Sequence, residues 1–452
     1  MCLIKKMIVN IKRGLFLSLI TVLVPVLLVS GGQFDRDFPD FPVEYYSLKN
    51  GLRIILCSDP SLPIVSVVVA YGAGTVREKK GQAGLAYFLE NLMFQGSENV
   101  GPLQHISYIQ KIGGELNAQT RFEKTVFYQT IPSNQLGLAL WLESDRMRSL
   151  SLSASAVEKV RGELIKEIDN RLATEPYFPS LEYFDTLLYP DYAYGHPWLS
   201  GEDIRNLTLD TIRNFYRDYY VPGNAVLCIC GNIQFSKAKE LITRYFGTLP
   251  PGPSFRPPDP PSFNQESDVV VRSLNPSAAS PGFCLGYRFH PLQTGDYHAL
   301  RILEYILLKG NTSRLVSRLV KKEMIAYSLD GWVEDRMNIS ALKIIALNTN
   351  EVMSQRAQRV LAAELERLKT SPVSENELNK AKRLFKADFM RQMASRVDRA
   401  LFLIDLAWRG NPLDSPSAEL EKYMKVESQS ILSLAVRHFV PAKRVLLNMG
   451  IR

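Results

Sequence analysis

Cysteine and histidine are both scarce in this chain of 452 residues, which contains five of each. Five cysteines are too few to stabilise a fold of this length through disulfide bonds, and they include no Cys-x-x-Cys pair or Cys/His cluster of zinc-finger spacing. No two histidines stand three or four positions apart, as two metal ligands on one helical face would. Disulfide-rich scaffolds and zinc-finger modules are therefore excluded.

Runs of lysine and arginine are also missing. The net charge is +8, but four of those charges belong to Lys5, Lys6, Lys12 and Arg13, and about +4 remains without them. So small a surplus disfavours nucleic acid as a partner. A composition of 46% hydrophobic and 22% charged residues is typical of a globular protein and argues against a disordered chain, a collagen or a polytopic membrane protein.

Residues 1–31 have the pattern of a secretory signal. A basic stretch, Lys5–Arg13, is followed by the apolar stretch Gly14–Val29 and by small residues. The alternative is a membrane anchor, but the apolar stretch is 16 residues long and contains Pro25, whereas roughly 20 residues are needed to span a bilayer. We therefore predict a bacterial periplasmic protein that meets the membrane only through this segment, during export.

A proline-rich segment divides the rest of the chain. Pro250–Glu266 contains seven prolines, which exclude a helix or a central strand and favour an extended linker. It separates an N-terminal domain, 32–249, from a C-terminal domain, 267–452. Three segments of the first domain have counterparts in the second, in the same order: Val69–Tyr71 with Leu285–Tyr287, Phe88–Gly96 with Ile302–Gly310, and Tyr220–Pro222 with Phe439–Pro441. This order indicates an internal duplication.

Strand-like and helical segments alternate in blocks within each domain. In the first domain we expect strands at 63–71, 115–120, 125–131 and 225–230, and helices at 84–94, 136–147, 154–172, 209–219 and 236–246, the last with Ser236 as its N-cap. This pattern predicts an α+β fold in which helices cover one face of a mostly antiparallel sheet in each domain. Four cysteines lie in the apolar runs and are expected to be buried: Cys57, Cys228, Cys230 and Cys284.

The segment Gly81–Gly101, GQAGLAYFLENLMFQGSENVG, resembles the active-site helix of the pitrilysin/insulinase family of zinc metallopeptidases, in particular the branch of mitochondrial processing peptidase. Gly113–Ala118, Tyr194–Gly201 and Tyr220–Ala225 are similar to further segments of that family, so the resemblance covers nearly the whole chain after the signal. It implies two homologous domains that form one half of a clam-shell chamber.

The zinc motif of that family, His-x-x-Glu-His, is degenerate here. The chain has Tyr87 and Asn91 where the family has its two histidines, and it keeps the general base as Glu90. A neutral phenol and a neutral amide are poor zinc ligands at pH 7. By the same resemblance, Glu167 corresponds to the third ligand. One carboxylate cannot hold zinc, so we predict no catalytic residue, metal or cofactor in this chain.

The simpler interpretation of the surviving glutamates is structural. We expect Glu90, Glu163 and Glu167 to be solvated or ion-paired carboxylates on helices. Two residues of the second domain, Arg314 and Tyr327, retain the type and spacing of a pair that holds substrate in the family. An arginine fork and a phenol can donate to peptide oxygens. The resemblance therefore assigns substrate binding to them; without it, Arg314 would be a solvated surface residue and Tyr327 a packed one.

Three functions are compatible with these observations. The first is a non-catalytic, substrate-binding subunit that pairs with a zinc-bearing homologue, so that zinc is expected only in the partner and the substrate is a peptide. The second is a peptide-binding or scaffold protein with no proteolytic partner. The third, an atypical active metallopeptidase that uses Glu90 and Glu167, ranks last because activation of a metal-bound water needs about three good ligands.

Overall fold

The computed structural model describes residues 41–254, 256–259, 267–274, 278–290, 292, 295–336, 339–410 and 415–450. The predicted signal, residues 1–31, lies outside this range, and so do residues 255 and 260–266 of the predicted linker. No helix within the described range is both long and apolar enough to cross a bilayer.

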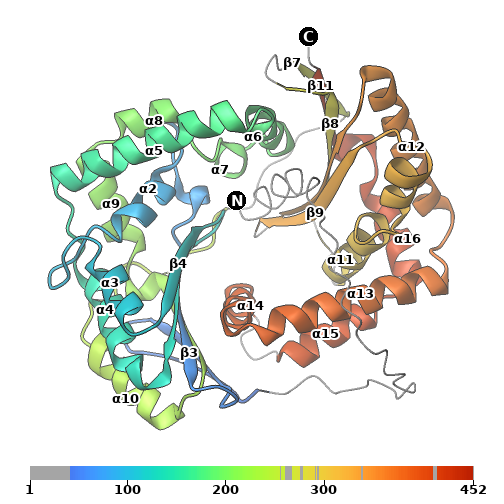
Figure 1. Ribbon diagram of the computed structural model, residues 1–452. Coiled ribbons are helices and arrows are strands. Elements are labelled where there is room, and N and C mark those ends of the chain that lie inside the picture. The colour runs from blue at the N-terminus through green and yellow to red at the C-terminus, as the bar shows by residue number, and fades with distance from the viewer. Residues whose placement is uncertain are drawn as a thin grey trace, which may run out of the picture. The chain divides into compact units, whose positions relative to one another are not determined.

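A sheet forms the centre of the N-terminal half (Figure 1). It has six strands in the order β1-β2-β6-β3-β5-β4. Its strands are β1 (Val43–Ser47), β2 (Arg53–Ser58), β3 (Ile64–Tyr71), β4 (Glu115–Thr120), β5 (Thr125–Pro132) and β6 (Ala225–Gly231). Strands β2 and β6 run parallel, and all other neighbours run antiparallel. The predicted mostly antiparallel sheet is thus confirmed.

The C-terminal half repeats this topology with five strands in the order β7-β11-β8-β10-β9. Its strands are β7 (Val269–Leu274), β8 (Gly282–Phe289), β9 (Ser328–Arg336), β10 (Ile339–Leu347) and β11 (Arg444–Gly450). Here β7 and β11 form the parallel pair, in the place of β2 and β6. The described residues include no counterpart of β1. The matching strand order agrees with the internal duplication that the sequence indicates.

Helices account for most of the remaining described residues, and the mixed α+β class is confirmed. In the N-terminal half these are α2 (Leu85–Leu92), α3 (Gln104–Lys111), α4 (Leu136–Arg148), α5 (Ala154–Thr174), α6 (Phe178–Leu188), α7 (Tyr192–Gly195), α8 (Gly201–Asn206), α9 (Leu209–Tyr219) and α10 (Phe235–Phe246). In the C-terminal half they are α11 (Asp296–Leu307), α12 (Glu351–Thr370), α13 (Glu375–Ala394), α14 (Arg396–Trp408), α15 (Pro416–Met424) and α16 (Ser428–His438), with a π-helical segment at Val316–Lys322. One predicted cap is wrong: α10 begins at Phe235, one residue before Ser236.

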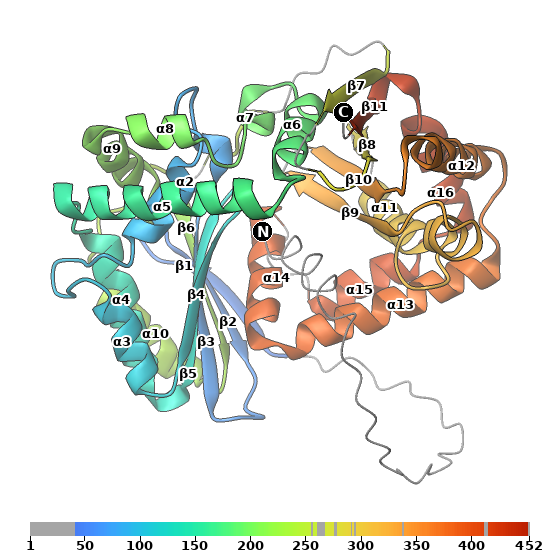
Figure 2. The ribbon, with the colours of Figure 1, turned by 45° about the horizontal axis from the view of Figure 1, so that its top comes forward.

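The two halves exchange a helix. Helices α2, α3 and α4 of the N-terminal half pack on one face of its sheet, as predicted, while α14 of the C-terminal half packs on the other face, against β3 and β6 (Figure 2). In return, α6 of the N-terminal half packs on β8 and β11. Both faces of each sheet are therefore covered. Cys57, Cys228 and Cys230 lie under α14 and are buried free thiols.

Each exchanged helix is fixed by an acidic residue. Asp185 of α6 binds Lys343 Nζ at 2.5 Å and Arg336 Nη2 at 2.7 Å on the second sheet. Asp405 of α14 binds Lys124, on the turn between β4 and β5 of the first sheet. Since a desolvated carboxylate is strongly unfavourable without a paired cation, these ion pairs select one position for each helix.

Candidate functional site

Helix α2 carries the degenerate motif, and a buried pair of Glu78 and His196 fixes where the helix begins. Gly84, at φ +99°, precedes the first turn. The Glu78 carboxylate accepts hydrogen bonds from the backbone N–H groups of Gly84, at 3.0 Å, and Ala86, at 2.7 Å. His196 Nε2 lies 2.8 Å from the same carboxylate. A carboxylate at the positive end of a helix dipole is stabilising, so Glu78 and His196 hold α2 in place.

The motif residues Tyr87 and Asn91 lie one helical turn apart, and a carboxylate on α5 meets the first of them. Tyr87 Oη donates to Glu167 Oε2 at 3.0 Å. Asn91 Nδ2 donates to the backbone oxygen of Tyr87 at 2.8 Å and so is bonded within its own helix. Glu167 also pairs with Arg171 Nη2 at 3.5 Å. The structure therefore brings together the degenerate motif and the predicted counterpart of the third ligand.

Glu90 is the exception among the surviving glutamates. It is buried, with 8% of its surface exposed, and its Oε2 accepts a hydrogen bond of 2.5 Å from Thr120 Oγ1 at the end of β4. Burial raises the pKa of Glu90 to about 7, the Thr120 hydrogen bond opposes the rise, and the charge of Glu167 adds to it. The expectation of a solvated or ion-paired carboxylate is wrong for Glu90, because the sequence does not show that this helix face turns inward.

The chemistry of these side chains does not fit a zinc ion. Burial and the charge of Glu167 raise the pKa of Tyr87, so the phenol remains protonated and acts as a donor rather than a ligand. Within the described residues, no three side chains of His, Cys, Asp or Glu gather closely enough to hold a metal. The Glu167 carboxylate is instead bonded to the Tyr87 hydroxyl and paired with Arg171.

Arg314 and Tyr327 lie in different surroundings. Arg314 forms a forked ion pair with Glu377 of α13, through Nε and Nη2 at 2.8 Å each. Tyr327, half exposed and immediately before β9, interacts with the Tyr177 hydroxyl next to α6. The structure records no contact between Arg314 and Tyr327, and the guanidinium fork assigned to a peptide is occupied by a carboxylate of the chain itself.

The model of the insulinase family, peptidase family M16, matches residues 53–178. The model of the peptidase M16 inactive domain matches residues 206–385. Together they cover about two thirds of the chain, including α2, α5 and the Arg314 segment. The chain belongs to peptidase family M16.

Relatives of this M16 chain include bacterial and mitochondrial proteins. The zinc protease PqqE of Helicobacter pylori is 28% identical over 374 residues, which cover 80% of this chain and 82% of the relative. The probable beta subunit of the mitochondrial processing peptidase of Schizosaccharomyces pombe is 29% identical over 211 residues, 46% of each chain. The predicted resemblance to the pitrilysin/insulinase family is confirmed.

Solved M16 structures share the fold. A protease from Helicobacter pylori superposes with a TM-score of 0.83 at 24% identity and covers 91% of this chain and all of its own. A peptidase M16 inactive domain from Pseudomonas fluorescens superposes with a TM-score of 0.78 at 18% identity, covering 91% of this chain and 98% of its own. The two-sheet α+β architecture is therefore that of the M16 fold.

Proposed function

We propose that this chain is the non-catalytic, substrate-binding subunit of a zinc peptidase pair, and that its partner is a homologous chain with an intact His-x-x-Glu-His motif. The observation that carries the proposal is the hydrogen bond from Tyr87 to Glu167. At the position where the family has a zinc ligand, this chain has a phenol that donates to the carboxylate. Export to a bacterial periplasm is part of the proposal and rests on residues 1–31.

The candidate site keeps carboxylates that the family resemblance assigns to a peptidase but lacks the two imidazoles. By that resemblance, helix α2 corresponds to the zinc helix, Glu90 to the base and Glu167 on α5 to the third ligand. Without two imidazoles, these groups cannot hold a cation that polarises a peptide carbonyl or activates water. An active metallopeptidase built on Glu90 and Glu167 is for this reason the weakest of the three candidates.

A peptide has a ready place to bind beside this remnant. Strand β4 is the outer strand of its sheet, and it ends at Thr120, the partner of Glu90. An outer strand can pair with an extended peptide through main-chain hydrogen bonds. We infer that substrate lies along β4, which would present it without cleaving it.

One observation favours the alternative of a scaffold without a proteolytic partner. The Nε and Nη2 edge of the Arg314 guanidinium is bound to Glu377, so a peptide can pair with that edge only if Arg314 leaves the ion pair. If Arg314 serves only to tie its segment to α13, the chain needs no substrate and no zinc-bearing neighbour.

Purification from the native host separates the two candidates. A subunit should elute with a zinc-bearing homologue identified by mass spectrometry, with about one zinc per pair, whereas a scaffold should elute without one. Sequencing the N-terminus of the purified chain tests export. One zinc per isolated chain, with peptide cleavage abolished by a chelator, would contradict both candidates.

The reconstituted pair then tests the substrate role. Arg314→Ala and Tyr327→Phe should lower the kcat/KM of the pair, by about 10²–10³ if the lost donor faces the developing oxyanion and by less, mainly in KM, if it only positions peptide. Tyr183→Phe, on an exposed tyrosine of α6, is the matched control. Unchanged kinetics in a complex that still forms would favour the scaffold.

A further inference from the structure

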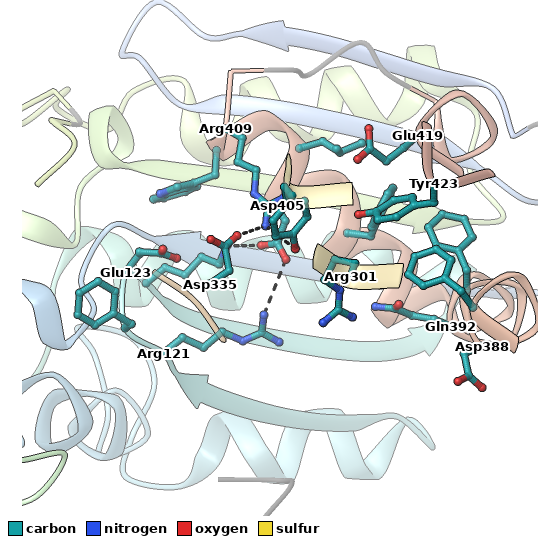
Figure 3. Close-up of a pocket in the computed structure, with 18 of the residues that line it drawn as sticks. Arg121, Glu123, Arg301, Asp335, Asp388, Gln392, Asp405, Arg409, Glu419 and Tyr423 are labelled. Carbon is teal, nitrogen blue, oxygen red and sulfur yellow. Dashed lines mark hydrogen bonds and ion pairs between the residues drawn. The ribbon is translucent and has the colours of Figure 1, made fainter. Parts of the chain in front are cut away.

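A cavity of about 560 Å³ lies between helices of the C-terminal half and the turn that follows β4, residues 121–124 (Figure 3). We name it the Arg301 cavity. The lining residues that matter here come from α11, α13, α14 and α15: Arg301, Tyr305, Phe385, Gln392, Trp408 and Tyr423. In the duplicated pattern Arg301 and Tyr305 are the counterparts of Tyr87 and Asn91. The cavity thus adjoins the second-half equivalent of the degenerate site and plays no part in the function proposed above.

Arg301 brings an incompletely neutralised positive charge to this cavity. Its Nη1 donates to Glu304 Oε2 at 2.5 Å, and Lys309 Nζ lies 3.1 Å from Glu304 Oε1. Two cations therefore share one carboxylate. The guanidinium of Arg301 points into the cavity in Figure 3. Its other nitrogens have no partner among the described residues and remain available to an anion.

Most acidic residues of the lining already have a hydrogen-bond or cationic partner. Arg301 therefore determines that the cavity prefers an anionic ligand. Asp388 accepts a hydrogen bond of 2.9 Å from Tyr305 Oη. The other pairs are Asp405 with Lys124, Asp335 with Arg409, and Glu419 with His298 and Lys422. Arg121, 3.9 Å from Asp405, adds a second cation that shares its carboxylate, and Glu123 completes the charged lining.

Aromatic rings form the wall next to Arg301. Phe385 stacks on Tyr423 with ring centroids 4.3 Å apart, and Tyr305 meets Phe385 edge-on at 5.3 Å. The exposed side chain of Gln392 reaches the cavity from α13. The cation suits a carboxylate, the aromatic wall suits an apolar side chain, and the amide suits a peptide group. The volume of the cavity lies within the range of about 300–1,000 Å³ that is typical of ligand sites.

We propose that the Arg301 cavity binds the C-terminal end of a short apolar peptide. The terminal carboxylate pairs with Arg301, since a charge-assisted bond to a guanidinium is stronger than a neutral one. The last side chain packs on Phe385 and Tyr423, and the Gln392 amide meets the peptide group. This assignment holds whether or not the chain pairs with a peptidase, because it uses neither α2 nor β4.

Calorimetric titration with N-acetyl-Phe-Phe and with its C-terminal amide tests the assignment on the whole chain. The two probes differ only in the terminal charge. The acid should bind about ten- to hundredfold more tightly than the amide, as expected for a lost hydrogen bond to a charged group. Equal affinity for acid and amide would overturn the proposal, and so would the absence of binding at about 1 mM peptide.

Two variants locate the binding. Gln392→Trp fills the cavity without removing a recorded side-chain bond, and it should abolish binding of the acid. Leu384→Trp adds the same indole to an exposed position of α13 that does not line the cavity, and it should leave binding unchanged. Arg301→Gln should weaken the acid about tenfold or more and leave the amide unaffected. Wild-type binding by Gln392→Trp would place the peptide elsewhere and refute the site.

Discussion

Two buried glutamates occupy matching positions on α2 and α11, and their electrostatic surroundings differ. Glu304, 2% exposed, lies beside two cations, Arg301 at 2.5 Å and Lys309 at 3.1 Å. Glu90, 8% exposed, has a hydrogen bond from Thr120 and no paired cation. Burial accordingly raises the pKa of Glu90 to about 7. The carboxylate at this position is therefore paired with cations of the chain in the C-terminal half and has no paired cation in the N-terminal half.

This difference distinguishes a structural carboxylate from the remnant of a functional one. Selection for stability alone pairs or removes a buried charge, because an unpaired one is costly to desolvate. The C-terminal half has acquired such pairing. Glu90, which the family resemblance assigns as the base, is instead buried without a paired cation among the described residues. The N-terminal half thus keeps a buried carboxylate without a paired cation at the position where the C-terminal half has an ion pair.

Restoring the ligands should change the comparison most. Tyr87→His combined with Asn91→His would give two imidazoles and Glu167 on facing helices. We expect about one zinc per chain. If a zinc site of four ligands binds with about 10–16 kcal/mol, each ligand contributes roughly a hundredfold in Kd, so each single variant should bind roughly a hundredfold more weakly. Metal analysis after dialysis measures this, and tight binding by one single variant would show that other residues are the ligands.

Removing the charge of Glu304 should be the next largest effect. In Glu304→Gln, Arg301 and Lys309 remain side by side without their carboxylate, and loss of one partner from a buried ion pair costs about 3–5 kcal/mol. Because these cations are 27% and 30% exposed, we expect the low end, about 3 kcal/mol, in urea denaturation. The control is Glu240→Gln, which breaks an exposed pair on α10. Equal losses in both variants would mean that the Glu304 cluster adds nothing specific.

Removing the charge of Glu90 should have the opposite effect on stability: the loss of the Glu304 charge destabilises the fold, whereas the loss of the Glu90 charge should stabilise it at high pH. Its pKa rises from the ordinary value of 4.5 to about 7 on folding, so the folded state keeps its proton to a higher pH than the unfolded state. Glu90 therefore contributes stability below pH 4.5 that is lost as the pH rises through about 7, a change of about 3 kcal/mol.

The comparison of Glu90→Gln with wild type at pH 5 and pH 8 measures that loss. The variant should be relatively more stable at pH 8, since it has no carboxylate to ionise in the core. Glu115→Gln, on an exposed residue of β4, controls for the change in net charge. A stability difference between wild type and Glu90→Gln that is the same at both pH values would mean that Glu90 ionises without penalty.

Much of the fold was predictable because its signals are local. The alternating and apolar runs predicted β3–β6 to within a residue or two, and the repeated segments indicated the second domain. The helix exchange was not predicted, although a signal was present. Strand β6, AVLCICG, is apolar throughout and is buried at every position, as expected of a strand covered on both faces. The sequence does not say that α14, some 170 residues later, provides the cover.

The sequence predicted which residues form the candidate site, but not the hydrogen bonds and ion pairs that they make. The family motif located Tyr87, Glu90, Asn91 and Glu167, which lie on two helices and do converge. The hydroxyl of Thr120 and the Glu377 partner of Arg314 were missed, because each is contributed by a segment distant in sequence and no spacing rule connects them. The burial of Glu90 depends on how α2 rotates against the sheet, and tertiary packing decides that rotation.

The smallest effect should come from the phenol that replaces the cation. Tyr87→Phe removes the hydrogen bond to Glu167 while keeping the ring, and Arg171 remains beside the carboxylate. A partly exposed hydrogen bond of this kind contributes about 1 kcal/mol, so unfolding should become easier by that amount. The control is Tyr183→Phe, at an exposed tyrosine on the neighbouring helix α6, and it should have no effect.

A double-mutant cycle of Tyr87→Phe with Glu167→Gln tests whether the hydroxyl acts through the carboxylate. The coupling between the two positions should equal most of the stability lost in Tyr87→Phe, because both changes remove the same bond. A coupling near zero would show that Tyr87 stabilises α2 through its ring alone and that its hydroxyl does not stabilise Glu167. That result would remove the main observation on which the proposed non-catalytic role rests.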